Sequence, residues 1–134
     1  MQIQYIEPAP GEYRSGACNI GPREIAKRRA IGIAGLISAV VLGVVLVAID
    51  APPLARAIVV FPLWAAIVSL EQARRRFCVA FAYAGIRSVA GSDATESVAD
   101  GADLARDHAT ARVMVAYSGA IAFAISAIFI VLPI

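Results

Sequence analysis

The sequence predicts an all-α integral membrane protein with three transmembrane helices. Of the 134 residues, 60% are hydrophobic, and the mean hydropathy is +0.74. Three long apolar runs cover about 30–49, 53–70 and 112–132, and eleven of the twelve basic residues lie on one side of them. The runs predict the spans, and the charge distribution predicts how they are oriented.

The first run shows why these segments are expected to cross a membrane. Residues 30–49 are twenty residues without a charge. As a helix they would be about 30 Å long, which is the thickness of the hydrocarbon core of a bilayer. A soluble domain of this size does not contain three helices that are apolar on every face. We therefore expect all three runs to be inserted in a membrane.

The basic residues give the predicted orientation, because positive charge flanking a span stays in the cytoplasm. We expect the N-terminus and the middle loop, at about 71–111, to lie inside and the C-terminus outside, as in a multi-pass protein of the inner membrane. Arg56 is the exception, and we expect it to pair weakly with Asp50 at the outer interface. The eleven other basic residues are Arg14, Arg23, Lys27, Arg28, Arg29, Arg74, Arg75, Arg76, Arg87, Arg106 and Arg112.

Two regions follow from this pattern, a polar tail at 1–21 and a three-helix membrane domain at 22–134. The tail has no helical period, and Gly21-Pro22 is typical of a helix start, because proline suits the first helical position. Basic clusters directly beside the apolar runs indicate lipid headgroups rather than nucleic acid as their partner. The residues predicted to meet headgroups are Lys27, Arg28, Arg29, Arg74, Arg75 and Arg76.

A shorter apolar stretch at 77–86 is too short to span a bilayer. It predicts a cytoplasmic interfacial helical segment at about 74–89; a re-entrant segment and an extension of the second helix are the alternatives. Its apolar side chains need a cover, either the N-terminal tail or another protein. The residues predicted to make this contact are Phe77, Cys78, Phe81 and Tyr83. Further on, Ser92-Asp93 with Glu96 resembles a helix-start cap, and Asp100-Gly101 resembles a turn.

Small residues recur at every fourth position in the first and third runs. Such stripes allow helix backbones to approach closely, and serines in them can form hydrogen bonds across the contact. Two interpretations remain open: the first and third runs pack on each other, or the stripes bind another membrane protein or a second copy. The stripes consist of Gly35, Ala39 and Gly43, and of Ser118, Ala122 and Ser126.

Pro62 lies in the middle of the second run, where it removes a backbone hydrogen bond and predicts a kink. The kink serves either as a hinge or simply as a bend for packing. Trp64, two positions later, is expected to fill the gap or to face a partner.

The sequence predicts no catalytic residues, no metal site and no cofactor. It has no paired carboxylates within a span, no phosphate-binding glycine loop and no zinc-ligand spacing. Cys18 and Cys78 are expected to be small packed residues, with a thiol-dependent sensor as the alternative, and His108 is expected at the surface. No ionisable residue lies away from the ends of the spans, which argues against coupled transport.

The leading hypothesis is therefore a small, non-catalytic accessory, scaffolding or assembly subunit of a larger membrane complex. It would contact membrane lipids and other integral membrane proteins or copies of itself. The alternative is a small oligomeric channel or carrier in which Pro62 and Trp64 line the path.

Overall fold

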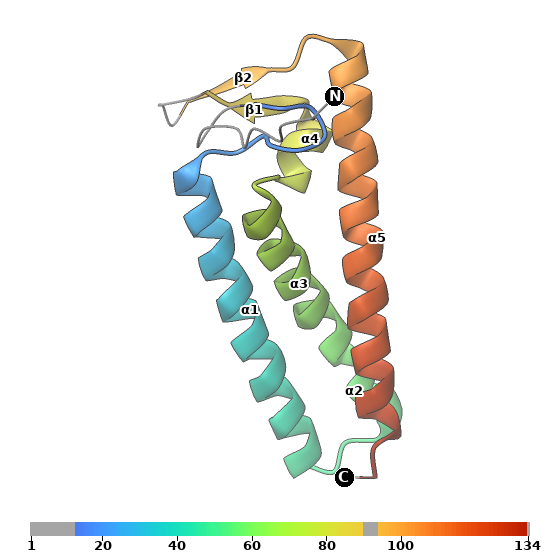
Figure 1. Ribbon diagram of the computed structural model, residues 1–134. Helices are drawn as coiled ribbons and strands as arrows, with labels where there is room; N and C mark the ends of the chain where they lie inside the picture. The colour runs from blue at the N-terminus through green and yellow to red at the C-terminus, as the bar shows by residue number, and fades with distance from the viewer. Residues whose placement is uncertain (1–12, 90–93, 134) are drawn as a thin grey trace, which may run out of the picture.

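The chain folds into a three-helix bundle with a small cap at one end (Figure 1). The structure is a computed structural model, which describes residues 13–89 and 94–133. Three helical segments within these residues are long and apolar enough to cross a membrane, at Pro22–Ala48, Pro53–Arg75 and Gly101–Val131. This confirms the predicted class, an all-α membrane protein with three spans.

Helix α1 (Pro22–Ala48) begins as the sequence predicts, with Gly21 as an extended N-cap and proline in the first turn. The helix therefore runs unbroken from the basic cluster through the first apolar run. It ends before Asp50, which adopts a left-handed conformation with φ of 56° in the turn to the next segment.

The second span consists of α2 (Pro53–Arg56), the 3-10 turn η1 (Ala57–Val59) and α3 (Val60–Arg75). The change of helix type directly precedes Pro62, which has no N–H to donate to the carbonyl one turn earlier. The irregularity predicted from Pro62 thus takes the form of a 3-10 turn between two α-helical parts.

Helix α5 (Gly101–Val131) starts about three turns before the third apolar run, because Asp100 caps it. The Asp100 carboxylate accepts hydrogen bonds from the amides of Ala102 at 2.8 Å and Asp103 at 3.4 Å. The predicted turn at Asp100-Gly101 is therefore wrong, because these residues are the N-cap and first residue of a helix. The predicted helix start is also wrong at Glu96, which lies in a strand; residues 92–93 lie outside the described residues.

The cap combines the N-terminal loop 13–20, helix α4 (Val79–Ala84) and a two-stranded antiparallel sheet, β1 (Ile86–Ser88) with β2 (Thr95–Ser97). Only part of the helical segment predicted at 74–89 forms, so that boundary is corrected. Arg76 and Gly85 adopt left-handed conformations, with φ of 58° and 71°, and end α3 and α4. Because Arg76 caps the end of α3 and a separate helix begins at Val79, 77–86 does not extend the second helix.

Helix α3 lies between α1 and α5, and this central position corrects one expectation about packing (Figure 1). α1 packs chiefly along α3 and not along α5. The reason lies in its glycines: a Cβ on Gly32 would fall 2.7 Å from Leu70, and one on Gly35 would fall 3.2 Å from Ala66. These close approaches leave α1 and α5 apart for much of their length. The two helices share one core cluster through Ala39 and Ala122, and a second through Leu42, Leu46 and Phe129.

Candidate functional site

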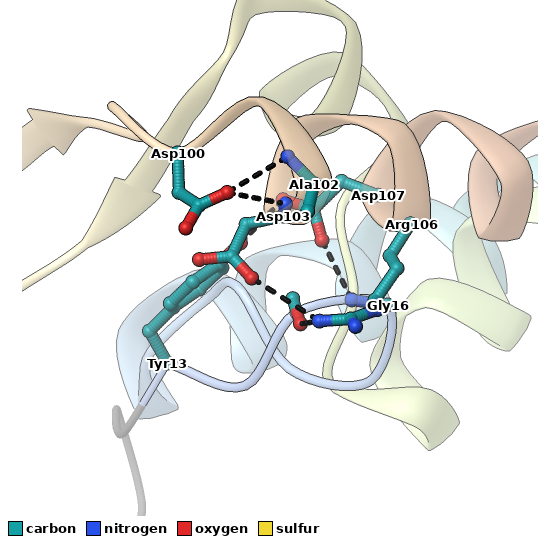
Figure 2. Close-up of polar contacts among 8 residues, drawn as sticks. Tyr13, Gly16, Asp100, Ala102, Asp103, Arg106 and Asp107 are labelled. Atoms are coloured by element: carbon teal, nitrogen blue, oxygen red, sulfur yellow. Dashed lines mark hydrogen bonds and ion pairs between the residues drawn. The ribbon is translucent and has the colours of Figure 1, made fainter.

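The end of the bundle that carries the cap, here called the polar end, holds a buried carboxylate. Asp107 is 0% exposed, and it accepts hydrogen bonds from the Tyr13 hydroxyl at 2.9 Å and from the Gly16 amide at 2.7 Å (Figure 2). Thr110, on the next turn of α5, donates to the Gly16 carbonyl at 2.8 Å. Helix α5 therefore holds the N-terminal loop by these three part-buried hydrogen bonds, of which two end on one carboxylate.

The contact with Asp107 also changes the pKa of the Tyr13 hydroxyl. Burial and the hydrogen bond to Asp107 raise the pKa of the Tyr13 hydroxyl above its ordinary value of 10.0. The Arg87 guanidinium lies over the ring of Tyr13, 4.8 Å from its centroid, and partly opposes this effect. The neutral hydroxyl thus remains a donor to Asp107 at any physiological pH.

A second buried network joins the N-terminal loop to the segment after α3. Asn19 is 1% exposed; its side-chain nitrogen donates to the Cys78 carbonyl at 3.0 Å, and its side-chain oxygen accepts from the Cys78 amide at 2.6 Å. Its own backbone bonds the Arg76 carbonyl and the Ser88 amide. Asn19 therefore links α3, the start of α4 and strand β1.

The apolar contact predicted at 77–86 is largely made within the chain. Phe77 and Cys78 are 0% exposed, and Phe77 packs with Ala82, Ala111 and Met114. Phe81 is half-buried and Tyr83 is exposed. The N-terminal loop is thus the cover for Cys78, and only the outer side chains of the stretch remain accessible.

The thiols and the histidine occupy packed positions. Cys18 and Cys78 are both buried and not joined in a disulfide, and Arg28 donates to the Cys78 sulfur at 3.2 Å. The His108 ring lies 5.6 Å from the ring of Tyr83, half-buried rather than fully at the surface. No group of three metal-binding side chains occurs in the part of the chain that the structure describes.

The predicted headgroup residues lie around the rim of the polar end. Lys27, Arg29, Arg74 and Arg75 are exposed, whereas Arg28 and Arg76 are half-buried. Arg74 and Arg75 both bind Glu71, with nitrogen–oxygen distances of 2.8 Å and 3.1 Å. The placement of the exposed four is compatible with a lipid surface, because they project where α1 and α3 reach the polar end.

The two small-residue stripes, predicted either to pack within the chain or to dock a partner, mostly face inward. Gly35 lies against Ala66, Ser118 and Ala122 are 0% exposed, and Ser126 is 3% exposed. Ser118 contributes a buried hydroxyl without a hydrogen-bond partner among the described residues. Packing inside the monomer therefore accounts for most of both stripes.

The Trp64 side chain packs inside the bundle. The Trp64 indole donates to the Val115 carbonyl at 3.1 Å and packs edge-on against Phe123. A Cβ on Gly119 would fall 2.8 Å from the indole ring, so Gly119 makes the space for it. Trp64 thus fills the α3–α5 contact.

A different small-residue stripe lies on the outer face of α5, which the sequence reasoning missed. Ala116, Ala120 and Ala124 recur at every fourth position, and all three are exposed. They lie between larger exposed side chains, among them Tyr117 and Phe123. The exposed face of α1 carries large aliphatic residues such as Ile37, Val40, Val41 and Val44, together with the small residues Ala30, Ala34 and Ser38.

Comparison with known proteins adds no assignment. No protein-family model matches the chain, and no curated protein or solved structure shows significant similarity to it.

Proposed function

We propose that the protein is a non-catalytic accessory or scaffolding subunit of the inner membrane, which binds a transmembrane helix of another protein or of a second copy through the outer face of α5. The exposed stripe Ala116, Ala120 and Ala124 carries this proposal. Lipid tails gain nothing from small residues, whereas a neighbouring helix can approach closely over them and gain packing contacts.

The hydrogen bonds at the polar end support a structural role for the polar residues that are buried there. Asp107 and Asn19 bind backbone groups and Tyr13 of the same chain, and Gln72 accepts from the Val79 amide at 2.9 Å. Groups held in this way stabilise the fold and are not free to handle a substrate. A path lined by Pro62 and Trp64 is not favoured, because the indole packs inside the bundle.

Site-specific crosslinking tests the proposal. A photoreactive phenylalanine analogue is placed at Tyr117, an exposed aromatic side chain beside the stripe, and, as the matched control, at Val41 on the exposed face of α1. After irradiation of intact membranes, we expect a discrete protein adduct from position 117 and only lipid adducts from position 41.

The replacement Ala120→Leu should abolish the association that the crosslink reports, because its branched side chain fills the stripe. Complex size on native gels in mild detergent provides the second measurement. A lone monomer in the gel, with no protein adduct from position 117, contradicts the proposal. Flux through liposomes containing the purified protein would favour the channel instead.

A further inference from the structure

A groove separates α1 from α5 in the half of the bundle far from the polar end. Its volume is about 420 Å³, and its walls are apolar except at one serine. Leu36, Val40 and Val44 of α1 form one wall, Ser126 and Phe129 of α5 form the other, and Leu63 lies at the floor. The groove is separate from the alanine stripe, which lies on the opposite face of α5.

The length of the groove matches one leaflet of a bilayer. Its lining on α1 extends from Leu36 to Val47. Eleven steps of a helix correspond to about 16 Å, roughly half of the ~30 Å hydrocarbon core. The groove therefore runs from about the middle of the membrane to the interface at the far end.

Ser126 is the one serine that lines this groove, and its hydroxyl is unpartnered among the described residues. The residue is 3% exposed, and its Oγ has no hydrogen-bond partner among the described residues. A buried hydroxyl without a partner is unfavourable in an apolar surrounding. An occupant that offers an acceptor at this depth would relieve it.

Arg56 places a positive charge at the interfacial end. It precedes Val59 and Leu63 of the floor by three and seven residues, so it continues the same helix face. Its guanidinium carbon lies 5.9 Å from the centroid of the Phe129 ring, and its Nε donates to the Ala51 carbonyl at 3.0 Å. Within residues 13–89 and 94–133, this is the only hydrogen bond that Arg56 makes. The ion pair between Arg56 and Asp50 that the sequence predicts does not form among these residues.

We propose that this groove binds one acyl chain of an anionic glycerophospholipid, with the lipid phosphate at Arg56 and an ester carbonyl accepting the Ser126 hydroxyl. Ser126 lies three residues, about 4.5 Å, deeper along α5 than Phe129, the neighbour of Arg56. The order of the groups therefore matches the lipid: phosphate at the interface, ester below it, and chain in the apolar part towards Leu36.

The size of the groove favours a lipid chain over a helix. A helix about 10–12 Å wide and about 16 Å long occupies roughly 1,300–1,800 Å³, several times the volume of the groove. A largely apolar space of about 420 Å³ with few polar groups is typical of a site for a small amphiphile.

Photolabelling with two lipids tests the site. The full chain is reconstituted in phosphatidylcholine nanodiscs that contain a small fraction of a probe with a diazirine in the middle of one chain and either a phosphatidylglycerol or a phosphatidylcholine headgroup. Peptide mass spectrometry then locates the adducts. We expect Val40, Val44 and Ile125 to be labelled about fivefold more by the phosphatidylglycerol probe, the factor typical of one cation near a headgroup.

Four variants distinguish the groove from general attraction of anionic lipid. Arg56→Gln should bring the labelling ratio to about one, and Arg56→Lys should restore most of it. Lys27→Gln removes a cation at the polar end and should leave the ratio unchanged. Gly43→Leu keeps Arg56 but fills the groove, since a Cβ at this position stands 3.7 Å from Phe129, and should reduce groove labelling by both probes.

The outcomes that overturn the proposal are equally specific. A ratio near one in the wild-type protein excludes selection of an anionic lipid at this site. An equal loss on Lys27→Gln and Arg56→Gln shows that the charge effect is not local to the groove. Protein adducts from Val44 carrying a photoreactive side chain, in place of lipid adducts, show that a helix occupies the groove.

Discussion

Asn19 binds both backbone groups of Cys78, donating to its carbonyl and accepting from its amide, as a neighbouring strand would. A single side chain thus substitutes for secondary structure at the point where the chain leaves α3 and enters α4. Because both residues are buried, these two hydrogen bonds have no water to replace them.

Replacing Asn19 with alanine should therefore destabilise the polar end. We expect Asn19→Ala to lower the free energy of unfolding by roughly 2–4 kcal/mol, since it leaves the Cys78 amide and carbonyl buried and unpaired. Thermal unfolding in a mild detergent measures this. Ser15→Ala is the matched control, because within the described residues the Ser15 hydroxyl makes only a long, exposed contact of 3.3 Å with Arg106. Equal losses in the two variants would contradict the role of Asn19.

Asp107 provides a second test of the polar end. Asp107→Asn keeps the size of the side chain, but an amide offers one accepting oxygen where the carboxylate offers two. We expect a loss of roughly 2 kcal/mol and faster hydrogen exchange at the Gly16 amide, which donates to Asp107 at 2.7 Å. The exposed contact of Asp103 with Arg106 makes Asp103→Asn the control, for which exchange at Gly16 should stay slow.

The ionisation of Tyr13 links the polar end to pH. Its pKa in the folded chain is raised above 10.0 by burial and by the hydrogen bond to Asp107, so the folded state holds this proton more tightly than the unfolded state. The contribution to stability is complete below pH ~10, the unfolded value, and is lost as the pH rises above it. A spectrophotometric titration, taken as the difference between wild type and Tyr13→Phe, should show a tyrosine that titrates above its normal range.

That titration has an internal control. Asp107→Asn removes the acceptor and the negative charge, and should move the Tyr13 titration back towards its ordinary pKa. A Tyr13 titration that stays the same in this variant would show that Asp107 does not raise its pKa.

The spans were predictable from the sequence, because crossing a bilayer imposes a length and a composition that local residues reveal. The cap was not predictable in the same way. Asn19 and Cys78 are 59 residues apart, and Tyr13 and Asp107 are 94 apart, so no local pattern joins them. The sheet formed by β1 and β2 has only three residues in each strand, too few to show an alternating pattern.

The sequence does contain one pattern that indicates the buried position of Asp107. The inward stripe Ser118, Ala122 and Ser126 continues towards the start of α5 through Met114 and Ala111 to Asp107, all of them buried. Following that helical face beyond the apolar run would have placed Asp107 inside. The exposed stripe Ala116, Ala120 and Ala124 was missed for a related reason. Periodicity alone does not say which of two small-residue faces of a helix is turned towards the bundle.

Gly119, on the side of α5 that faces the bundle, gives the last prediction. Gly119 makes room for Trp64, whose ring would lie 2.8 Å from a Cβ at this position, and an indole ring has little freedom to move aside. We expect Gly119→Ala to destabilise the bundle by about 1–3 kcal/mol through overpacking. Gly43→Ala is the control, because its Cβ would meet Phe129 at an ordinary contact distance of 3.7 Å and should leave stability within about 0.5 kcal/mol. Fluorescence of Trp64, the single tryptophan, reports both the unfolding and any displacement of the ring; an unchanged spectrum and stability in Gly119→Ala would show that α3 and α5 do not meet as closely as described.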